Sequence, residues 1–439
     1  MSSEAEDLKL KILSDVKKYG DMKYASTTFT AGIDAIPVSG KVLDASDLIN
    51  LVDSSLEGWL TSGRFTKNFE RELANYVGSR SALLVNSGSS ANLIALSGLT
   101  SPKLGERALR KGDEVITVAM GFPTTVNPII QNGLIPVFVD IDLDTLDVNV
   151  AQVEQAISKK TKAIMLAHTL GNPFNVKKIL EICEANDLWL IEDSCDALGS
   201  NYDGKKTGSF GDTATVSFYP AHHITTGEGG AVFVKSPLVS KQVESFRDWG
   251  RDCYCDTGCD NTCKKRFEWQ LGDLPYGYDH KYIYSHIGYN LKATDMQAAL
   301  GLSQIKKLEF FIKRRKENFN YLKNGLSDLN GIRIATATPN SDPSWFGFPI
   351  TLEENLGFSR EDLLRFLDSR KIGSRLLFAG NILKQPGYRD IDCRVFGDLK
   401  NTNKVMKDSF WVGVYPGLTN PMLDYVILSI KEFFSQHRK

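Results

Sequence analysis

The stretch that decides the fold is Ser217–Gly230, which reads SFYPAHHITTGEGG. A short apolar run, Ala214–Phe218, leads into this stretch and a second one, Ala231–Val234, leaves it. We expect both runs to be buried strands. The glycines between them allow the backbone to approach a ligand closely. The pattern therefore predicts a ligand-binding loop between two strands.

Further apolar runs lie upstream of this loop. They alternate with helical segments, which is typical of a mostly parallel sheet that is buried on both faces. Such sheets bind ligands beyond the carboxyl ends of their strands. The seven expected strands are Ala82–Val85, Glu114–Val118, Pro136–Val139, Ala163–Ala167, Leu188–Glu192, Ala214–Phe218 and Ala231–Val234.

The length of 439 residues is sufficient for two domains. We expect an N-terminal helical arm over residues 1–40, a large α/β domain over 41–305 and a smaller α+β domain over 306–439. Residues 245–290 interrupt the alternation and are rich in Cys, Asp, Tyr and Gly. They predict a long irregular insertion, and loops of this length are usually functional or disordered. Helices are expected at Leu43–Leu60, at Thr66–Val77 and from Thr294 past Arg315.

Charge and hydropathy exclude several function classes. The chain carries 52 basic and 53 acidic residues, and no block of like charge indicates nucleic-acid or membrane binding. Residues 1–24 are polar and lysine-rich, without the apolar core of a signal peptide, and no apolar run reaches transmembrane length. A cytoplasmic location is the default expectation.

The loop Ser217–Gly230 resembles the cofactor loop of fold-type I pyridoxal phosphate enzymes, which have the aspartate aminotransferase-like fold, and specifically of their sugar aminotransferase branch. That family reads Ser-Phe, three residues, Lys, then Thr-x-Gly-Glu-Gly-Gly, and the lysine binds the cofactor as a Schiff base. Here the lysine position is His222, and no lysine occurs between Lys206 and Lys235. Histidine forms no stable Schiff base but exchanges protons near neutral pH. The resemblance therefore implies non-covalently held pyridoxamine 5'-phosphate, with His222 as the catalytic base and no fixed role for His223.

The resemblance also implies a phosphate site. Gly88, Ser89 and Ser90 follow the first strand and open a helix. Backbone amides at a helix start, together with small hydroxyl groups, favour an anion, although an ordinary N-cap is the alternative. In the family this segment holds the cofactor phosphate, and Ser217 matches a second phosphate contact.

Other positions match the cofactor ring and the neighbouring subunit. Phe122 matches the residue that stacks on the pyridine ring, and Asp193 matches the carboxylate that binds the protonated pyridine nitrogen. Asp196 stands where relatives often carry Gln or His, so its role stays open. Asn290 matches an asparagine that reaches the partner's cofactor phosphate, which implies a homodimer. His168 follows the strand Ala163–Ala167 and is a candidate for either substrate contact or structure.

Four of the seven cysteines are crowded together as Cys253-x-Cys255-x3-Cys259-x3-Cys263. Dense thiolates bind soft metals or iron–sulfur clusters, and a zinc loop or free thiols are the alternatives. A second set of four replaces Cys259 by Cys195. Its spacing, Cys195-x57-Cys253-x-Cys255-x7-Cys263, resembles the [2Fe–2S] motif of the CDP-4-keto-6-deoxy-D-glucose 3-dehydrases of 3,6-dideoxyhexose (O-antigen) biosynthesis.

That resemblance implies 3-deoxygenation of a CDP-linked 4-keto-6-deoxy sugar. His222 would take a proton from the cofactor methylene carbon, and the [2Fe–2S] cluster would relay single electrons from a separate flavin-containing NADH reductase. One alternative is a GDP-4-keto-6-deoxy-D-mannose 3-dehydratase, which also has His for Lys but no cluster. A non-catalytic homologue is the other, although the retained Asp193 speaks against it. Arg375 and Lys41 are candidates for diphosphate contacts or are solvated surface charges.

Overall fold

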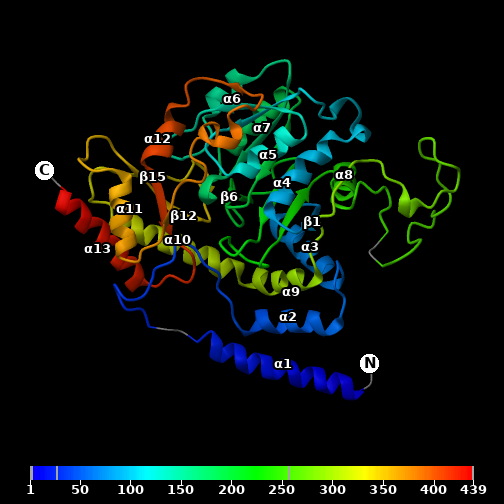
Figure 1. The fold of residues 1–439 in the computed structure, drawn as a ribbon, viewed down its shortest axis with the longest axis horizontal. Helices are drawn as coiled ribbons and strands as arrows, with labels where there is room; N and C mark the ends of the chain where they lie inside the picture. Colours follow the sequence, from blue (N-terminus) through cyan, green and yellow to red (C-terminus); the bar gives the residue numbers. More distant parts are fainter. Residues whose placement is uncertain (1–2, 26–27, 256–257, 438–439) are drawn as a thin grey trace.

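A computed structural model describes residues 3–25, 28–255 and 258–437 (Figure 1). Its centre is an eight-stranded sheet in the order β1-β9-β8-β5-β4-β2-β3-β14. The seven strands expected from the sequence all form within two residues of their predicted bounds, which confirms the α/β class. The strands are β1 (Ser81–Val85), β2 (Glu114–Val118), β3 (Ile135–Val139), β4 (Thr161–Ala167), β5 (Trp189–Asp193), β8 (Thr213–Ser217), β9 (Gly230–Val234) and β14 (Arg394–Val395).

Most of this sheet is parallel, and only β9 runs antiparallel to its neighbours β1 and β8. The eighth strand, β14, was not expected. It comes from the C-terminal part of the chain and pairs in parallel with β3. Arg394 of β14 binds the Glu114 carboxylate of β2 with two nitrogens, at 2.9 and 2.7 Å.

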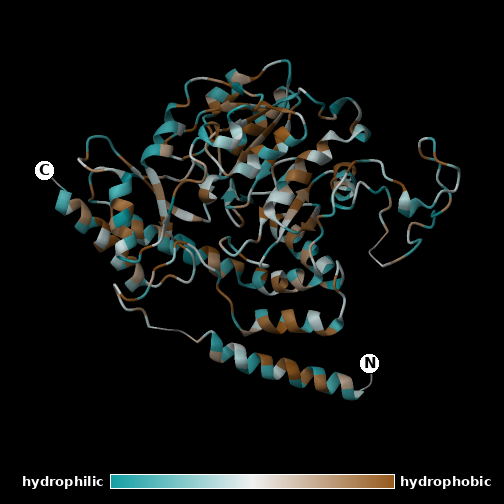
Figure 2. Ribbon diagram, in the orientation of Figure 1, coloured by the Kyte–Doolittle hydropathy of each residue, from teal (hydrophilic) through white to brown (hydrophobic). Residues whose placement is uncertain are grey.

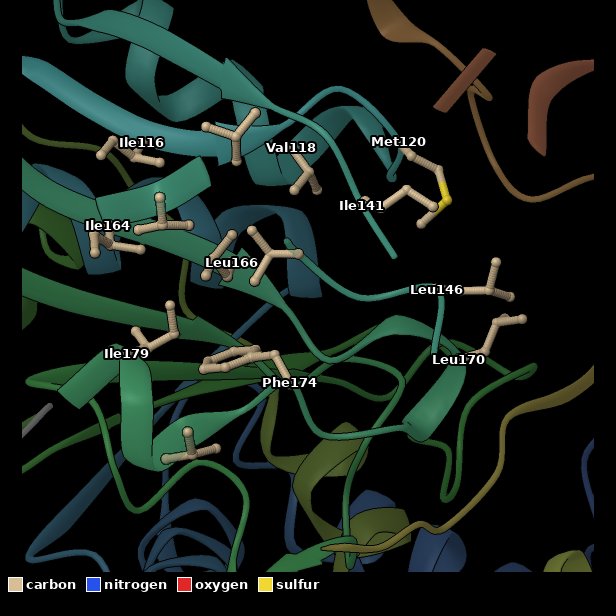
Figure 3. Packing of buried hydrophobic residues seen from close by; sticks show 14 of the residues in the cluster. Ile116, Val118, Met120, Ile141, Leu146, Ile164, Leu166, Leu170, Phe174 and Ile179 are labelled. Atoms are coloured by element: carbon tan, nitrogen blue, oxygen red, sulfur yellow. The ribbon is translucent and has the colours of Figure 1, made fainter. Parts of the chain in front are cut away.

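Helices cover both faces of the sheet. Apolar side chains of α4 (Gly88–Ser97) and α8 (Pro237–Arg247) pack on one face of β1 and β9, while α3 (Arg64–Val77) and α9 (Asp295–Gln304) pack on the other. Figure 3 shows Ile116 of β2, Ile164 and Leu166 of β4, and Phe174 gathered in a third cluster. Hydrophobic residues therefore concentrate in the strands and in the helices against them (Figure 2). The other helices near this sheet are α5 (Pro123–Gln131), α6 (Val150–Ala156) and α7 (Val176–Ala185).

A second, four-stranded antiparallel sheet has the order β10-β12-β15-β13. Its strands are β10 (Ile332–Ile334), β12 (Gly347–Leu352), β15 (Ser409–Gly413) and β13 (Ser374–Arg375), packed against α10 (Leu308–Gly325), α11 (Arg360–Ser369), α12 (Lys400–Asp408) and α13 (Asn420–His437). A small third sheet contains β11 (Ser341–Asp342), β6 (Asn201–Tyr202) and β7 (Lys205–Lys206). The expected domain boundaries at residues 40/41 and 305/306 stay a prediction.

The N-terminal helices stack beneath the large sheet. Helix α1 (Ser3–Lys23) packs on α2 (Ala45–Glu57), and α2 packs on α9 (Figure 1). Gly20 permits the close approach of α1, because a Cβ there would lie 2.8 Å from the Cβ of Ala45. The fully buried Asp47 of α2 accepts hydrogen bonds from Lys307 and Gln304.

The insertion that follows α8 projects away from the two sheets (Figure 1). Its one helical element is the 3-10 helix η4 (His280–Tyr282), within the described part of the insertion. The base of the insertion is anchored by His286, whose two ring nitrogens lie 2.7 Å from Ser101 Oγ and 2.8 Å from Ser245 Oγ. The other 3-10 helices are η1 (Gly98–Thr100), η2 (Pro102–Arg107), η3 (Thr169–Gly171), η5 (Ile305–Lys307), η6 (Ile382–Lys384) and η7 (Pro386–Tyr388).

None of the described helices combines the length and the hydropathy that a membrane span requires.

Candidate active site at the carboxyl ends of the strands

A cleft of about 740 Å³ opens where β4, β5 and β8 end. This is the place at which parallel sheets bind ligands. Its opposite wall comes from the four-stranded sheet and its loops, including Arg375, Phe378 and Trp411. The cleft brings together most of the residues singled out in the sequence, namely Gly88, Ser89, Phe122, Asp193, Cys195, Asp196, Ser217 and His222. Ser90 and Asn290 are not among its lining residues.

Asp193 is the last residue of β5 and is 4% exposed. Its Oδ2 accepts hydrogen bonds from Asn92 Nδ2 at 2.8 Å and from Thr125 Oγ1 at 2.7 Å. Its Oδ1 accepts one from the backbone amide of Cys195 at 3.2 Å. Burying a carboxylate is costly unless hydrogen bonds satisfy it, and these three donors fix its position. The carboxylate is therefore held rigidly at the floor of the cleft.

Two of these supports, Asn92 and Thr125, were not identified from the sequence. Asn92 is fully buried on the apolar helix α4, and its own Oδ1 accepts a hydrogen bond from Thr215 at 2.6 Å. A buried amide needs partners, so an asparagine inside the apolar run from Ala91 to Leu96 was the one available signal.

The start of α4 forms a narrow backbone approach to the cleft. Ser87 caps the helix by accepting a hydrogen bond from the amide of Ser90, so that Ser90 takes part in the cap. Gly88 is required here, since a Cβ would lie 2.4 Å from Ser217 Cβ. The first amides of a helix have no acceptors within the helix and favour an anion. Gly88, Ser89 and Ser217 thus bring helix-start amides and small hydroxyl groups together at one place in the cleft.

His222 lies on the loop after β8 and lines the cleft. Its amide donates to Tyr219 O at 2.9 Å, and its ring centroid is 5.2 Å from that of Phe346. Its Nδ1 lies 3.4 Å from Asp196 Oδ1, without the geometry of a hydrogen bond. Burial and the Arg315 guanidinium lower the pKa of His222 to about 4. The imidazole is therefore neutral at physiological pH, which is the protonation state that a base requires.

Asp196 and Arg315 provide the charges around this imidazole. Burial and the neighbouring Asp193 raise the pKa of Asp196 to about 8, although Arg315 opposes the rise. Arg315 of α10 is 1% exposed, and burial lowers its pKa to about 9. Its role was not foreseen, because the run of basic residues at 313–316 is typical of a solvated helix face.

Two other histidines near the cleft have structural contacts. His168 is fully buried, its Nε2 lies 3.0 Å from Glu192 Oε2, and its ring stacks on Phe174. His223 is also buried, and its Nε2 lies 2.7 Å from Ser344 O. Both rings thus have buried partners, although His168 also lines the cleft; of the three histidines only His222 is partly exposed.

Phe122 and Asn290 differ in their relation to the cleft. Phe122, at the start of α5, is 53% exposed, lines the cleft and makes an edge contact with Phe378. Its ring is free to stack on a planar ligand. Asn290 is exposed beyond the cleft and pairs through its backbone with Asp248. Within a single chain it contributes nothing to the site.

The cysteines divide into two places. Cys195 lines the cleft, whereas Cys253, Cys255, Cys259 and Cys263 line a separate small hollow in the insertion. The Cys255 amide donates to Cys253 Sγ at 3.4 Å. Burial raises the pKa of the Cys255 thiol, but hydrogen bonds from Thr262, Cys263 and Cys253 lower it to about 7. Among the described residues, no three His, Cys, Asp or Glu side chains are arranged to hold a metal ion.

Known proteins with similar sequences identify the family of this chain. The family model of the DegT/DnrJ/EryC1/StrS aminotransferases matches residues 43–431. The lipopolysaccharide biosynthesis protein RfbH of Salmonella typhimurium is 58% identical over 98% of this chain and 99% of its own. The dTDP-4-dehydro-2,6-dideoxy-D-glucose 3-dehydratase of Saccharopolyspora spinosa is 54% identical over 98% and 93%, respectively.

Solved structures agree with this relationship. The E. coli GDP-4-keto-6-deoxy-D-mannose-3-dehydratase with bound hydrated PLP superposes with a TM-score of 0.82, at 29% identity, over 91% of this chain and 99% of that one. The match spans both the large mostly parallel sheet and the four-stranded sheet. The chain therefore belongs to the DegT/DnrJ/EryC1/StrS aminotransferase family and has the fold-type I architecture of pyridoxal phosphate-dependent sugar aminotransferases.

Proposed function

We propose that this protein removes the C3 hydroxyl of a CDP-linked 4-keto-6-deoxy sugar with non-covalently bound pyridoxamine 5'-phosphate. The observation that carries the proposal is His222, a neutral imidazole at the position where the family has its lysine. None of the residues that line the described cleft is a lysine. The 3-dehydratase with 54% identity supports the same reaction class.

The residues of the cleft fit this cofactor. Gly88, Ser89 and Ser217 form the cradle for its phosphate, and Phe122 offers an open ring face for its pyridine. Asp193, held by three donors, is a carboxylate placed to bind the pyridine nitrogen. When bound, the cofactor supplies an amine that condenses with the C4 ketone and a ring that accepts electrons.

His222 performs the proton transfer in this proposal. Its Nδ1 lies 3.4 Å from Asp196 Oδ1 and has no hydrogen-bond partner in the described part of the chain. His222 takes a proton from the methylene carbon of the cofactor. The Asp196 side chain lies beside the imidazolium that forms, and the buried Asp193 carboxylate attracts its positive charge. The proton held by the His222 imidazolium is then available to the C3 hydroxyl, which leaves as water.

Completing the deoxygenation requires two electrons and two protons for each C–OH that becomes C–H. We propose a separate flavin-containing NADH reductase as their source. A [2Fe–2S] cluster on Cys195, Cys253, Cys255 and Cys263 rests on the cysteine spacing alone. Because Cys195 and the other three line different hollows, the described geometry does not fit that set, and no electron path through it is derived.

Arg375 is the proposed contact for the diphosphate of the substrate. It is the only Lys or Arg among the residues that line the described cleft. Its one described hydrogen bond goes to the neighbouring Ser374 O, at 2.8 Å, so its fork is available for a phosphate. Lys41 instead lines a small hollow behind His222.

The separation of the cysteines favours one rival, the cluster-free 3-dehydratase that the GDP-sugar enzymes represent. A relative of this kind from Yersinia pseudotuberculosis is 32% identical over 86% of this chain. Anaerobic purification followed by iron and sulfide analysis separates the two, and competition by CDP, dTDP and GDP identifies the nucleotide.

We also propose a homodimer in which Asn290 reaches the cofactor phosphate of the second copy. The support is its exposed position outside its own cleft. Sedimentation under assay conditions tests the assembly, and an active monomer contradicts it.

The function itself is tested with purified protein, pyridoxamine phosphate, a CDP-4-keto-6-deoxy sugar and a reductase with NADH. The 3-deoxy sugar is the expected product. Borohydride reduction in the presence of pyridoxal phosphate is expected to label no lysine. Transamination of the sugar, or a labelled lysine, would refute the proposal.

A further inference from the structure

Arg315 is a buried cation whose hydrogen-bond partners are backbone carbonyl groups. Its Nη1 donates to Trp345 O at 3.3 Å and Phe346 O at 3.2 Å, and its Nη2 donates to His222 O at 3.2 Å. Its Nε has no partner in the described part of the chain. An internal guanidinium that no carboxylate neutralises directly is costly to bury. Its retention there therefore requires an explanation.

The position of Arg315 provides that explanation. Arg315 lies on helix α10. Its guanidinium donates hydrogen bonds both to the segment before β12 and to the loop that contains His222. Two carboxyl groups at the end of β5, Asp193 and Asp196, line the same cleft as the imidazole, and Asp196 Oδ1 lies 3.4 Å from His222 Nδ1. His222 therefore has a buried guanidinium at its backbone and acidic side chains near its ring.

We propose that Arg315 is a positioning residue that holds the His222 backbone through its hydrogen bond to His222 O and keeps the imidazole unprotonated. This inference rests on the proposed role of His222 as a base and adds the group that makes it one. Without a cation at this site, the Asp193 carboxylate would hold a proton on the imidazole up to a higher pH, so that the base would be lost under less acidic conditions than in the wild type.

The electrostatic balance around His222 includes every element packed against it. The titratable and charged side chains that line the two hollows next to His222 are Lys41, His168, Asp193, Cys195, Asp196, Tyr219, His223, Glu228, Arg315 and Arg375. Arg315 lowers the pKa of His222, and Asp193 raises it. Arg315 also lowers the pKa of Asp196. Removing the Arg315 charge would therefore raise the pKa of both His222 and Asp196.

Two substitutions separate charge from anchoring. Arg315→Gln removes the charge but keeps two N–H donors for the carbonyl groups, whereas Arg315→Lys keeps the charge. Arg314→Gln is the matched control, because Arg314 is adjacent on α10 and binds Glu317, Asn318 and Leu418 O instead. The chain has six histidines, so histidine-labelled full-length protein gives an NMR titration that His222→Asn assigns.

We expect the pKa of His222 to be higher in Arg315→Gln than in the wild type by about one pH unit or more. Arg315→Lys and Arg314→Gln should keep the wild-type titration. An unchanged His222 titration in Arg315→Gln would overturn the inference. If Arg315→Gln does not fold, Arg315→Lys decides: a wild-type titration supports the inference, and a rise of about one pH unit overturns it.

The cofactor-methylene proton exchange rate provides a second readout. In Arg315→Gln its acidic limb should move to higher pH by the same amount as the titration, with a loss of about tenfold per pH unit below it. If the wild type catalyses no exchange, the proposed function is wrong. The NMR titration still tests whether Arg315 lowers the pKa of His222, because it does not depend on catalysis.

Discussion

The cleft and the insertion are built on different physical principles. In the cleft, sheet pairing brings strand ends together, and buried hydrogen bonds then fix Asp193 and the start of α4. The described part of the insertion contains no strand of a sheet; there the buried His280 stacks on Trp269, and Arg266 forms an ion pair with Asp279. It leaves large hydrophobic side chains exposed, namely Trp249, Tyr254, Phe267, Tyr276, Tyr278, Tyr282, Tyr284 and Ile287.

This difference shows where a sequence motif predicts which residues lie close together in space. A residue at the end of a buried strand has neighbours that the sheet order determines. A residue in a long irregular segment has neighbours that depend on a few side-chain pairs. Each of the following experiments perturbs one region and asks whether the other responds.

The largest effect is expected inside the cleft. His222→Asn should slow exchange of the cofactor methylene proton by roughly 10²–10⁴-fold, as for a lost general base. Pyridoxamine phosphate affinity should change little, because its proposed contacts lie elsewhere. His223→Asn is the control, and we expect less than a tenfold loss, because its ring bonds to Ser344 O. A larger loss in His223→Asn than in His222→Asn would show that the histidine roles are reversed.

The next experiment asks whether the two regions share a metal centre. The cysteine spacing predicts that Cys195→Ser, Cys253→Ser, Cys255→Ser and Cys263→Ser each lose most of any bound iron, whereas the separate hollow of Cys195 predicts that Cys195→Ser keeps it. All four variants should still bind pyridoxamine phosphate. Iron is measured in proteins prepared anaerobically side by side. The exposed Cys259 supplies the matched variant, because Cys259→Ser should retain its iron. Full iron in Cys195→Ser would confine the metal to the insertion.

Arg375→Gln should raise the KM for the sugar nucleotide by about tenfold or more and leave kcat nearly unchanged. A hydrogen bond to a charged group contributes about 1.5–3 kcal/mol, and it holds substrate equally before and during the reaction. Arg80→Gln is the control, since Arg80 is exposed and outside the cleft. A fall in kcat with unchanged KM would remove Arg375 from the substrate diphosphate.

The smallest effect is on stability. The raised pKa of Asp196, about 8 against 3.8 when unfolded, means that between these pH values the folded chain keeps a proton that the unfolded chain has lost. Stability therefore falls as pH rises through this window, by up to about 1.4 kcal/mol per pH unit. His222 acts oppositely from pH 6.5 to 4, so the Asp196 effect is clearest from pH 6.5 to 8.

Asp196→Asn should therefore stabilise the cofactor-free protein at pH 8 more than at pH 6.5, as measured by denaturant unfolding. The exposed Asp390 provides the control substitution Asp390→Asn. An equal effect of Asp196→Asn at both pH values would contradict the raised pKa.

The sequence could predict the large sheet because each strand is a short continuous apolar run, which is a local signal. It could predict Asp193 and His222 because they end strands or lie on the loop between them. It could not predict Asn92, which meets Asp193 across 101 positions, or Arg315, whose burial arises only from packing. Spacing along the chain likewise does not set the distance from Cys195 to the insertion.

Strand β14 has a consequence for biosynthesis. The Arg394–Glu114 pair joins residues 280 positions apart, and the edge of β3 stays unpaired until residue 394 has left the ribosome. Contacts of such long range form slowly, and an open strand edge attracts other chains. Nascent chains of this protein thus pass through a long interval in which the sheet is nearly complete but its β3 edge can pair with other chains. Binding by a chaperone would protect this edge most just before translation ends.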